Sequence, residues 1–587
     1  MFVQLSRSPL IALFLLLDAS GSSEAESFRI GAADATLDGL VSVGTTIRTG
    51  DPDPALISTT NGAAAGIAGT SPSGRNQDDG NLNYRKGDAV STVFKTLINF
   101  EMKYASYGLQ VRGSAWHDAV LAGGGKPWGD VTNGYVPGAS TNTSGASGAR
   151  LLDANIYGTV SFGERPLFLK VGNQTLPWGA PASIAGGLSS LNPVSLPAAR
   201  RPGAVADETR IPFPAIFARF GLTQQIGLEA FYQFRFQPSE MFGCGTFYST
   251  LDYLGDGCNN LVLGGALNDR QSMAARNFSK RAPDLDTSDQ GQFGLGLTYT
   301  PAGNIRLGAY YAQYHSRTPF VSAKKAQRAI PYIVGDPDGL NPQYLVQYPE
   351  RISMFGFNVQ AQFPGMSGFA EIVHRPNQPV QLNSTDILNA AASNVAPTLL
   401  RQDYAAIPLG GIYNAYDRLA VTDILVGLRA IRPGILGATS SSIGGEFGLK
   451  HVHDLPDFNQ RRYGRSDVFG NVPFNGQCTG AGYTNISCTN DGFVSRDAYG
   501  ARARASLTYA DIFDDTTMTP SVTYGYDISG WSYDGVINEG RQFAVLDLRF
   551  ETAKRYTTVI SFNPTWGGRY NNARDRSTIS LSFAARF

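Results

Sequence analysis

The sequence predicts an all-β fold, a single antiparallel β-barrel that crosses a bacterial outer membrane. First, runs of strand-forming residues come in pairs across very short turns, and long polar segments separate the pairs. Second, these runs alternate apolar and polar residues, as strands do when one face meets lipid and the other an aqueous lumen. Third, no internal stretch approaches the roughly eighteen apolar residues of a transmembrane helix. In such barrels short turns lie on the periplasmic side and long loops lie outside.

The turns and strands can be placed individually. The short turns are expected at Ala105–Ser106, Glu164–Arg165, Thr223–Gln224, Pro301–Ala302, Pro364–Met366, Pro433–Ala438, Ile512–Thr516 and Ala553–Arg555. The strands are expected at 37–48, 92–104, 107–117, 152–163, 166–176, 213–222, 225–236, 291–300, 303–316, 351–363, 367–376, 419–432, 439–453, 497–511, 517–527, 540–552, 556–564 and 577–587. This gives about eighteen strands, or sixteen if the pair within 419–453 is loop and lumen material.

The composition fits one large sheet better than a string of soluble domains. The 587 residues include 67 Gly, 27 Tyr and 33 Phe, while charged residues make up only 16%. Aromatic residues favour strands. The formal net charge is zero, so the chain shows no electrostatic footprint for nucleic acid, and no nucleic-acid partner is expected.

The N-terminal residues resemble a signal peptide for export. Arg7 supplies positive charge, Pro9 to Leu17 form an apolar core, and Ser23-Glu24-Ala25 resembles a cleavage site of small residues. Cleavage is expected after Ala25, which leaves residues 26–587 as the barrel.

The last predicted strand carries a second export sign. Its apolar face consists of Ile579, Leu581, Phe583, Ala585 and Phe587. A final alternating strand that ends in an aromatic residue is typical of outer-membrane barrels and is read by the barrel assembly machinery. The alternative is an ordinary edge strand. The expected location is the outer membrane, with its lipid as a partner.

The four cysteines come as two close pairs, Cys244 with Cys258 and Cys478 with Cys488. Locally paired cysteines in an exported protein indicate disulfides. A zinc site is the alternative, but neither pair has the tight spacing of zinc ligands and no histidine is near. Of three connectivities, 244–258 with 478–488 is favoured.

Strand alternation also predicts which charges face the lumen. Within 499–509, Arg502 and Arg504 share one face, and an arginine facing lipid at mid-depth would cost several kcal/mol. The same reasoning assigns eight basic residues to the lumen: Lys95, Lys103, Arg112, Lys170, Arg235, Arg306, Arg502 and Arg504. They outnumber their acidic neighbours, which favours anionic ligands.

The segment 178–212 is predicted to fold into the pore as a constriction. It contains Arg200, Arg201 and Arg210 among prolines and alanines, which suits a folded-in segment better than a free loop. With Trp178, these arginines are the candidate substrate-contacting residues, because a guanidinium fork matches carboxylate or phosphate groups. Alternatively, the arginines pair with Asp207, Glu208 or strand carboxylates and only hold the segment in place.

Other candidate sites are weaker. Residues 388–406 have helical composition and predict a short helix that either caps the pore or lies on the surface. His451 and His453 share a face and could bind a metal, but a polar surface role is favoured. The glycine-rich stretches lack the setting of a nucleotide site. No catalytic constellation stands out, so no enzymatic activity, cofactor or metal is expected.

Five stretches stand out as specific motifs: residues 78–88 (DDGNLNYRKGD), 170–179 (KVGNQTLPWG), 192–203, 244–258 and 310–317. In these stretches the chain resembles the domain-of-unknown-function 1302 family of Gram-negative exported proteins. Asn173 stands where that family usually has arginine. The resemblance implies an outer-membrane barrel, often encoded beside an RND-type exporter, that is suspected of moving hydrophobic compounds.

Together these observations predict an outer-membrane channel or transporter for a small hydrophobic or amphipathic substrate, with some preference for anions. A general diffusion porin is the first alternative. A structural or adhesion barrel without transport is the second.

Overall fold

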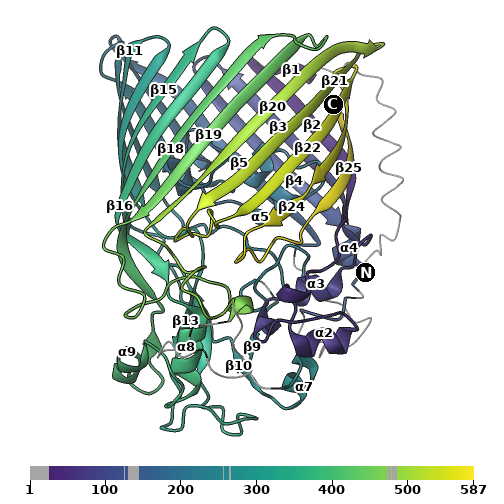
Figure 1. Ribbon diagram of the computed structural model, residues 1–587. Coiled ribbons are helices and arrows are strands. Elements are labelled where there is room, and N and C mark those ends of the chain that lie inside the picture. Colours follow the sequence, from purple (N-terminus) through teal and green to yellow (C-terminus); the bar gives the residue numbers. More distant parts are fainter. Residues whose placement is uncertain are drawn as a thin grey trace, which may run out of the picture.

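The computed structural model describes residues 26–124, 126–129, 145–255, 257–263, 266–470, 472, 478 and 486–587. The predicted signal peptide, residues 1–25, lies outside the described residues. Figure 1 shows a barrel of long strands at one end of the molecule, and a thick layer of connections and short helices at the other end.

Eighteen strands of the described chain form the barrel wall. They are β2 (Ala33–Arg48), β3 (Ala89–Tyr104), β4 (Tyr107–Asp118), β5 (Ser147–Phe162), β6 (Arg165–Gln174), β7 (Phe213–Gly221), β8 (Ile226–Gln233), β11 (Phe293–Ala302), β12 (Ile305–Tyr314), β15 (Ile352–Phe363), β16 (Met366–Gln381), β18 (Tyr416–Pro433), β19 (Ser440–Val452), β20 (Asp497–Phe513), β21 (Thr516–Ser529), β22 (Arg541–Thr552), β23 (Tyr556–Asn563) and β25 (Thr578–Arg586). Each pairs antiparallel with its neighbours, and β2 pairs with β25 from Leu40↔Arg586 to Arg48↔Thr578 to close the sheet.

The closed eighteen-stranded barrel confirms the predicted fold class. The two strands predicted within 419–453, for which loop and lumen material was the alternative, are part of the wall. β18 pairs with β16 along most of its length, and β19 pairs with both β18 and β20. Two short strands are added to the sheet: β1 (Glu26–Ile30) pairs with the start of β2, and β24 (Thr565–Gly567) pairs with β22 beyond the end of β23.

The eight short turns all connect strands at one end of the barrel, as predicted. Several are so tight that ordinary residues adopt left-handed backbone, as at Ala105 (φ 50°) and at Ala553 and Lys554 (φ 53° and 52°). Such two-residue turns match the right-handed twist of the strands they join. The strand register on this side is therefore fixed locally.

The long connections carry the remaining elements. The short strands are β9 (Asn260–Val262), β10 (Phe278–Lys280), β13 (Phe320–Lys324), β14 (Gln343–Gln347) and β17 (Ile412–Tyr413). The helices are α2 (Thr59–Ala65), α3 (Asp79–Asn83), α4 (Ala119–Ala122), α5 (Leu196–Arg200), α6 (Ala206–Thr209), α7 (Asp269–Ala274), α8 (Ser384–Ala392) and α9 (Arg401–Ala406), with short 3-10 turns at Pro54–Leu56, Gly74–Asn76, Leu188–Leu191 and Asp467–Phe469. Both predicted disulfides, Cys244–Cys258 and Cys478–Cys488, are confirmed.

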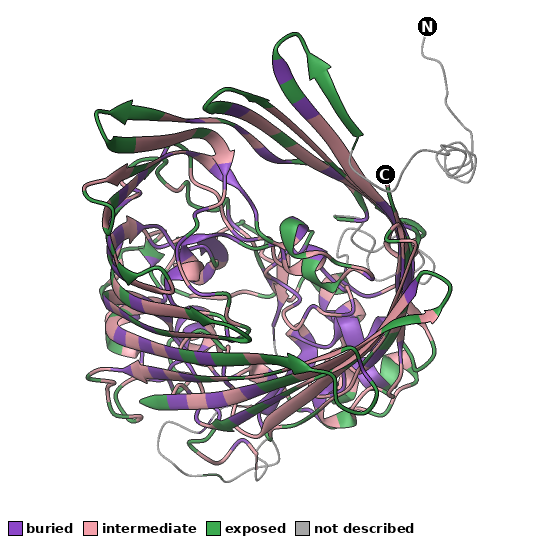
Figure 2. Ribbon diagram, turned by 90° about the horizontal axis from the view of Figure 1, so that it is seen from above, coloured by how far each residue is buried: buried purple, intermediate pink, exposed green. Residues whose placement is uncertain are grey.

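The outside of the barrel is apolar. Along β11, Leu295 and Leu297 are 59% and 48% exposed, whereas Gly294, Gly296 and Thr298 between and beside them are buried. Exposed large apolar residues continue around the wall: Ile98, Val111, Ile156, Val171, Leu228, Phe357, Ile372, Leu428, Ile443, Val522, Leu546, Ile560 and Leu581. Figure 2 shows this alternation of buried and exposed residues along the strands.

Among the described residues, no helix has both the length and the hydropathy needed to span a bilayer.

Part of the lumen is a hydrophobic core. Leu176, Leu188 and Leu191 come from the connection after β6, and they pack against inward side chains such as Phe213 and Met354. All are 1% exposed or less. Seen from above, connections fill much of the area within the ring of strands (Figure 2), and Figure 1 shows that most of the labelled helices lie beyond the end of the barrel. The inner wall on this side is therefore covered by packed apolar side chains.

Candidate functional site

The connection between β6 and β7, residues 175–212, runs across the inside of the barrel. It starts at a buried anchor, Trp178, which is 3% exposed. The indole Nε1 donates to Glu229 Oε2 at 2.8 Å, and its ring contacts Phe231 and Tyr310 at centroid distances of 5.0 and 4.9 Å. Trp178 was predicted to contact substrate, but this burial places it as an anchor of the connection. We call residues 175–212 the inward segment.

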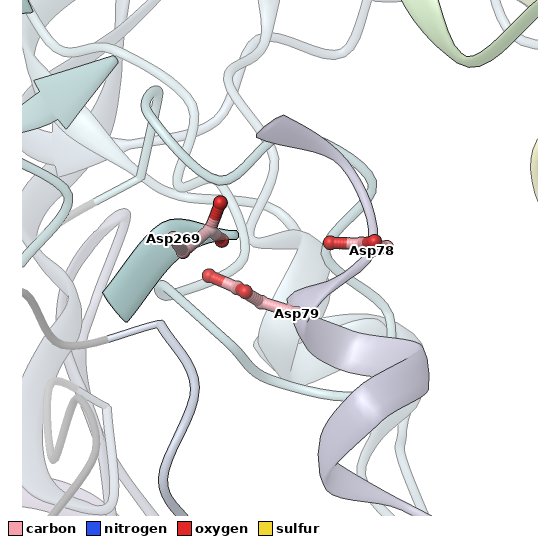
Figure 3. Close-up of side chains that lie close together, drawn as sticks. All are labelled: Asp78, Asp79 and Asp269. Carbon is pink, nitrogen blue, oxygen red and sulfur yellow. The ribbon is translucent and has the colours of Figure 1, made fainter. Parts of the chain in front are cut away.

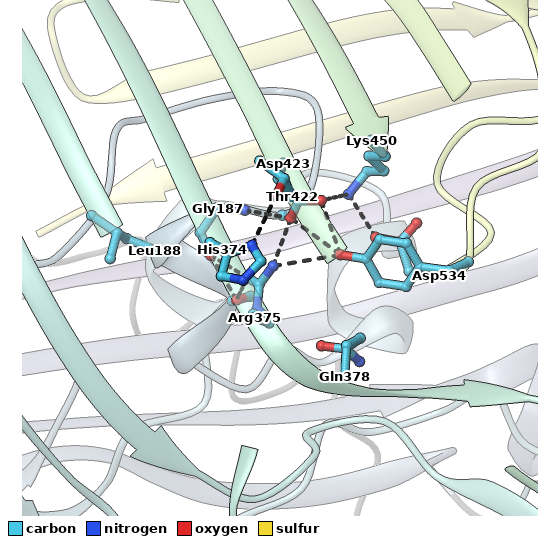
Figure 4. A network of polar contacts seen from close by, with 12 residues as sticks. Gly187, Leu188, His374, Arg375, Gln378, Thr422, Asp423, Lys450 and Asp534 are labelled. Atoms are coloured by element: carbon cyan, nitrogen blue, oxygen red, sulfur yellow. Dashed lines mark hydrogen bonds and ion pairs between the residues drawn. The ribbon is translucent and has the colours of Figure 1, made fainter. Parts of the chain in front are cut away.

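Residues 180–190 of the inward segment are held by the inner faces of β16, β18 and β19, and Asp423 of β18 accepts from Gly187 N at 3.4 Å. Glu371 of β16 accepts hydrogen bonds from the backbone of Leu188 (2.7 Å) and Ala180 (3.2 Å). Arg375 of β16 donates to Gly187 O and Ser190 Oγ, both at 2.8 Å (Figure 4). Glu446 of β19 accepts from Ser183 N at 2.6 Å. The sequence analysis did not identify these strand residues.

Two adjacent glycines allow this close approach. Gly187 has φ 62°, and a Cβ there would overlap Glu371 Oε1. Gly186 has φ 134°, and a Cβ there would lie 2.7 Å from Lys450 Nζ. Any larger residue would push the inward segment away from the wall, because both positions combine left-handed backbone with contact to a charged group.

Arg375 belongs to a buried network of charges (Figure 4). Its Nη1 donates to Asp423 Oδ2 at 2.8 Å, and Tyr533 Oη donates to Asp423 Oδ1 at 2.9 Å. Lys450, opposite Asp423 in the strand register, donates to Asp534 at 2.6 Å. Two cations and two anions are thus paired, with Arg375, Lys450 and Asp423 buried and Asp534 partly exposed, and such pairing is the condition for burying charge. The network joins the inward segment, the wall and the β21–β22 connection.

The second half of the inward segment is fastened to a different part of the wall. Glu208 pairs with Lys95 of β3, whose Nζ also donates to Gly203 O at 2.7 Å. Asp207 pairs with Arg112 of β4 at 3.2 Å. Thus the ion pairs of Asp207 and Glu208 are with wall residues, while Glu208 also lies near enough to Arg201 to favour its charged form. The predicted pairing with the arginines of the segment holds only for that weaker interaction.

The three arginines of the inward segment differ in their surroundings. The guanidinium of Arg201 lies 3.9 Å from the Trp116 ring centroid, and burial lowers its pKa to about 10, so it remains charged at neutral pH. Arg200 is exposed, with its guanidinium 5.1 Å from the ring of Tyr248. Arg210 is also exposed. Within the described chain, no carboxylate lies in ion-pair distance of Arg200 or Arg210.

Most of the predicted lumen-facing bases are neutralised on the wall. Besides Lys95 and Arg112, the ion pairs are Lys103–Glu101 (2.9 Å), Arg306–Glu229 (2.7 Å, shared with Arg219) and Arg502–Asp527 (2.7 Å, shared with Arg541). Lys170 lies near Asp153. Arg504 is exposed on the same face as Arg502, whereas Arg235 lies beyond the last residue of β8 and so is not on a strand. The count of bases in the sequence thus overstated the positive charge.

A cavity of about 810 Å³ lies between the inward segment and the layer of long connections. Its polar lining includes Arg210 and Ser190 of the inward segment. Its apolar lining comes largely from the connections, including Leu254, Leu261, Leu263, Tyr344, Ile387 and Leu388. The last two belong to α8, which overlaps the start of the stretch 388–406 predicted to be helical, and α9 forms the end of that stretch. The structure thus has two short helices there, and one face of α8 borders the cavity.

The histidine pair lies outside this site. His451 Nδ1 is 2.7 Å from Asp497 Oδ1, and His453 Nε2 is 2.8 Å from Thr422 Oγ1, which is also 3.0 Å from His374 Nδ1. Successive side chains of a strand point to opposite faces. Lys450 and Arg375 point inward, so the adjacent His451 and His374 are on the outer face of the wall, together with His453.

Comparison with protein families gives one assignment. The family model described as "Protein of unknown function (DUF1302)" matches residues 6–587, so the chain belongs to this family, as its motifs predicted. The comparison with curated proteins found no match.

Solved structures with a similar fold include outer-membrane proteins of several bacteria. OccAB1 of Acinetobacter baumannii is 12% identical, with a TM-score of 0.39 over 96% of this chain and 98% of that one. OccK11 (OpdR) of Pseudomonas aeruginosa is 8% identical, with a TM-score of 0.40 over 97% and 99%. OmpT of Vibrio cholerae is 7% identical, with a TM-score of 0.35 over 96% and 100%. The fold assignment stands on the strand pairing of this chain itself.

The anchoring of the inward segment can be tested with Arg375→Ala. This change leaves Asp423 buried with one fewer cation and removes the bonds to Gly187 and Ser190, so we expect a loss of roughly 3–5 kcal/mol in unfolding free energy. Denaturant titration of the protein in detergent measures it, and proteolysis within 180–190 should become faster. The control is Arg504→Ala, which removes an exposed arginine of the inner wall. Equal effects of the two substitutions would contradict the anchoring role.

Proposed function

We propose that this member of the DUF1302 family is an outer-membrane channel or transporter for a small amphipathic solute with an apolar body and an anionic group. The observation that carries the proposal is the inward segment, which is fastened to two parts of the wall and borders a cavity of about 810 Å³. A barrel built only for adhesion or support has no need for such an arrangement.

The apolar outer face of the wall supports the location. Soluble proteins rarely expose continuous apolar patches beyond a few hundred Å², whereas here exposed Leu, Ile, Val and Phe side chains continue around the barrel. A lipid bilayer would cover this surface. The short turns then lie on the periplasmic side and the long connections outside, as in other barrels of this kind.

The cavity suits an amphipathic ligand. Its volume falls in the range of about 300–1,000 Å³ that is usual for small-molecule sites. Leucine and isoleucine side chains of the connections supply apolar contacts. The exposed guanidinium of Arg210 can donate two parallel hydrogen bonds to a carboxylate or phosphate. A solute entering from the long connections would meet the cavity before the inward segment.

The inward segment would then act as the constriction. It is tied through Glu371 and Arg375 on one part of the wall and through Lys95 and Arg112 on another. These ties hold it across the route. The cationic groups of Arg200, Arg201 and Arg210 would favour anions at this level.

Channel recordings test the constriction. In planar bilayers the unmodified protein should show a low conductance, and deletion of residues 183–190 should raise it several-fold, because the tip that reaches β16, β18 and β19 is removed. Deletion of residues 393–397, in the connection that carries α8 and α9, is the matched control and should change little. A large, steady and unselective conductance of the unmodified protein would identify a general diffusion porin instead.

Reversal potentials test the arginines. Replacing Arg200, Arg201 and Arg210 together with alanine should lower the anion-to-cation permeability ratio several-fold, because three cations are lost from the constriction. The control replaces three arginines of the outer connections, Arg328, Arg401 and Arg461, and so removes the same total charge. If both triple variants keep the original anion preference, these arginines do not select the solute.

A further inference from the structure

Four buried aspartates meet where two long connections touch. Asp78 and Asp79 stand at the start of α3 in the β2–β3 connection, and Asp269 begins α7 in the β8–β11 connection. One carboxylate oxygen from each of these three lies within 4.8 Å of the others (Figure 3). The fourth, Asp252, lies between Cys244 and Cys258, and its Oδ2 accepts from Asp79 N at 3.3 Å. The cluster is outside the barrel lumen and takes no part in the inward segment.

Several oxygens of the cluster have no protein donor. Asp78 is satisfied by Ser58 N (2.8 Å) and Asn61 Nδ2 (3.0 Å). In contrast, both carboxylate oxygens of Asp79, Oδ1 of Asp252 and Oδ1 of Asp269 are buried without a hydrogen-bond donor among the described residues. Asp79 is 1% exposed, and Asp252 is 8% exposed. Buried polar atoms of native proteins are nearly always paired, so these oxygens point to a bound group.

The geometry of the cluster points to a cation. Carboxylate oxygens of Asp78, Asp79 and Asp269 lie within 4.8 Å of one another, and Asp252 contacts the backbone of Asp79, so a bound cation would offset the repulsion among four buried carboxylates. Arg75 and Arg576 approach from the flanks, where Arg75 donates to Leu267 O and Arg576 donates to Asn81 Oδ1. These two guanidiniums lie at the edge of the cluster, and the four carboxylate oxygens named above still have no hydrogen-bond donor within the described chain. A cation bound among the carboxylates would contact those oxygens.

We propose that Asp78, Asp79, Asp252 and Asp269 bind a calcium ion that ties the β2–β3 connection to the β8–β11 connection. The available ligands are carboxylate oxygens, which hard cations prefer. Calcium accepts six to eight oxygens in flexible geometry, so water and backbone carbonyls could complete the set. Zinc is disfavoured because the cluster offers neither histidine nor thiolate, and the cysteines that flank Asp252 form a disulfide.

The ion would also fix one wall of the cavity. Gln77, which precedes Asp78, and Leu251 and Tyr253, which flank Asp252, all line it. This consequence depends on the proposed transport function, whereas calcium binding itself does not.

Calcium binding can be measured on the full chain in detergent. After treatment with a chelator and its removal, isothermal titration with calcium chloride should show one site, and the thermal midpoint should rise relative to the chelated sample. Asp79→Asn should weaken binding at least tenfold, because it removes a charged ligand. Asp338→Asn, at an exposed position of another connection, is the matched control and should bind as the unmodified protein does.

Three results would overturn the proposal. They are a titration without binding, equal affinity of Asp79→Asn and the unmodified protein, and a larger thermal shift with magnesium than with calcium. The proposal stays testable if the variant does not fold. Terbium bound to the unmodified protein should give sensitised luminescence, and added calcium should displace the terbium and lower the signal. No transport measurement enters these tests, so their failure would leave the channel proposal intact.

Discussion

The pairing of β2 with β25 is the constraint on which the rest of the structure depends. A strand in a sheet leaves its edge amides and carbonyls unpaired unless another strand covers them, and in a nonpolar environment each unpaired group is costly. Nine consecutive residue pairs, from Leu40↔Arg586 to Arg48↔Thr578, join the first and last wall strands and remove both edges. Closure also separates an inner from an outer face. Every assignment of a side chain to apolar exterior or to interior follows from that separation.

Inside the closed wall, the inward segment creates two kinds of environment. Leu176, Trp178 and the side chain of Leu188 fill the space against β7, β8 and β15, so this part of the lumen behaves like the core of a soluble protein. At its tip the contacts are polar, through Glu371, Arg375 and Asp423. Hydrogen bonds to charged groups are worth more where water is scarce. The apolar packing therefore strengthens the polar ties that hold the tip in place.

The distribution of charge follows the same logic. Bases on the wall are compensated by acids on adjacent strands or on the inward segment, as with Lys95 and Glu208 or Arg502 and Asp527. Arg200 and Arg210, which extend from the segment into open space, are not compensated in the described chain. Strand pairing brings opposite charges together at fixed distances, whereas a connection that crosses the lumen can present side chains away from the wall. Under the proposed function, the cations available to a solute are therefore those of the segment and the exposed Arg504, rather than the paired bases of the wall.

The sequence by itself predicted the barrel, about eighteen strands, the grouping of the short turns at one end and, as the favoured pairing, both disulfides. These features depend on local signals: a period of two residues along each strand, turn residues at fixed places and cysteines close in the chain. Only the tertiary structure decided the partners of the charged residues and the role of Trp178. Glu208 lies 113 residues from Lys95, and Asp269 lies 208 residues from Asn61. Such pairs form because the closed barrel brings segments that are distant in the sequence close together in space. A local pattern in the sequence does not report contacts between residues so far apart.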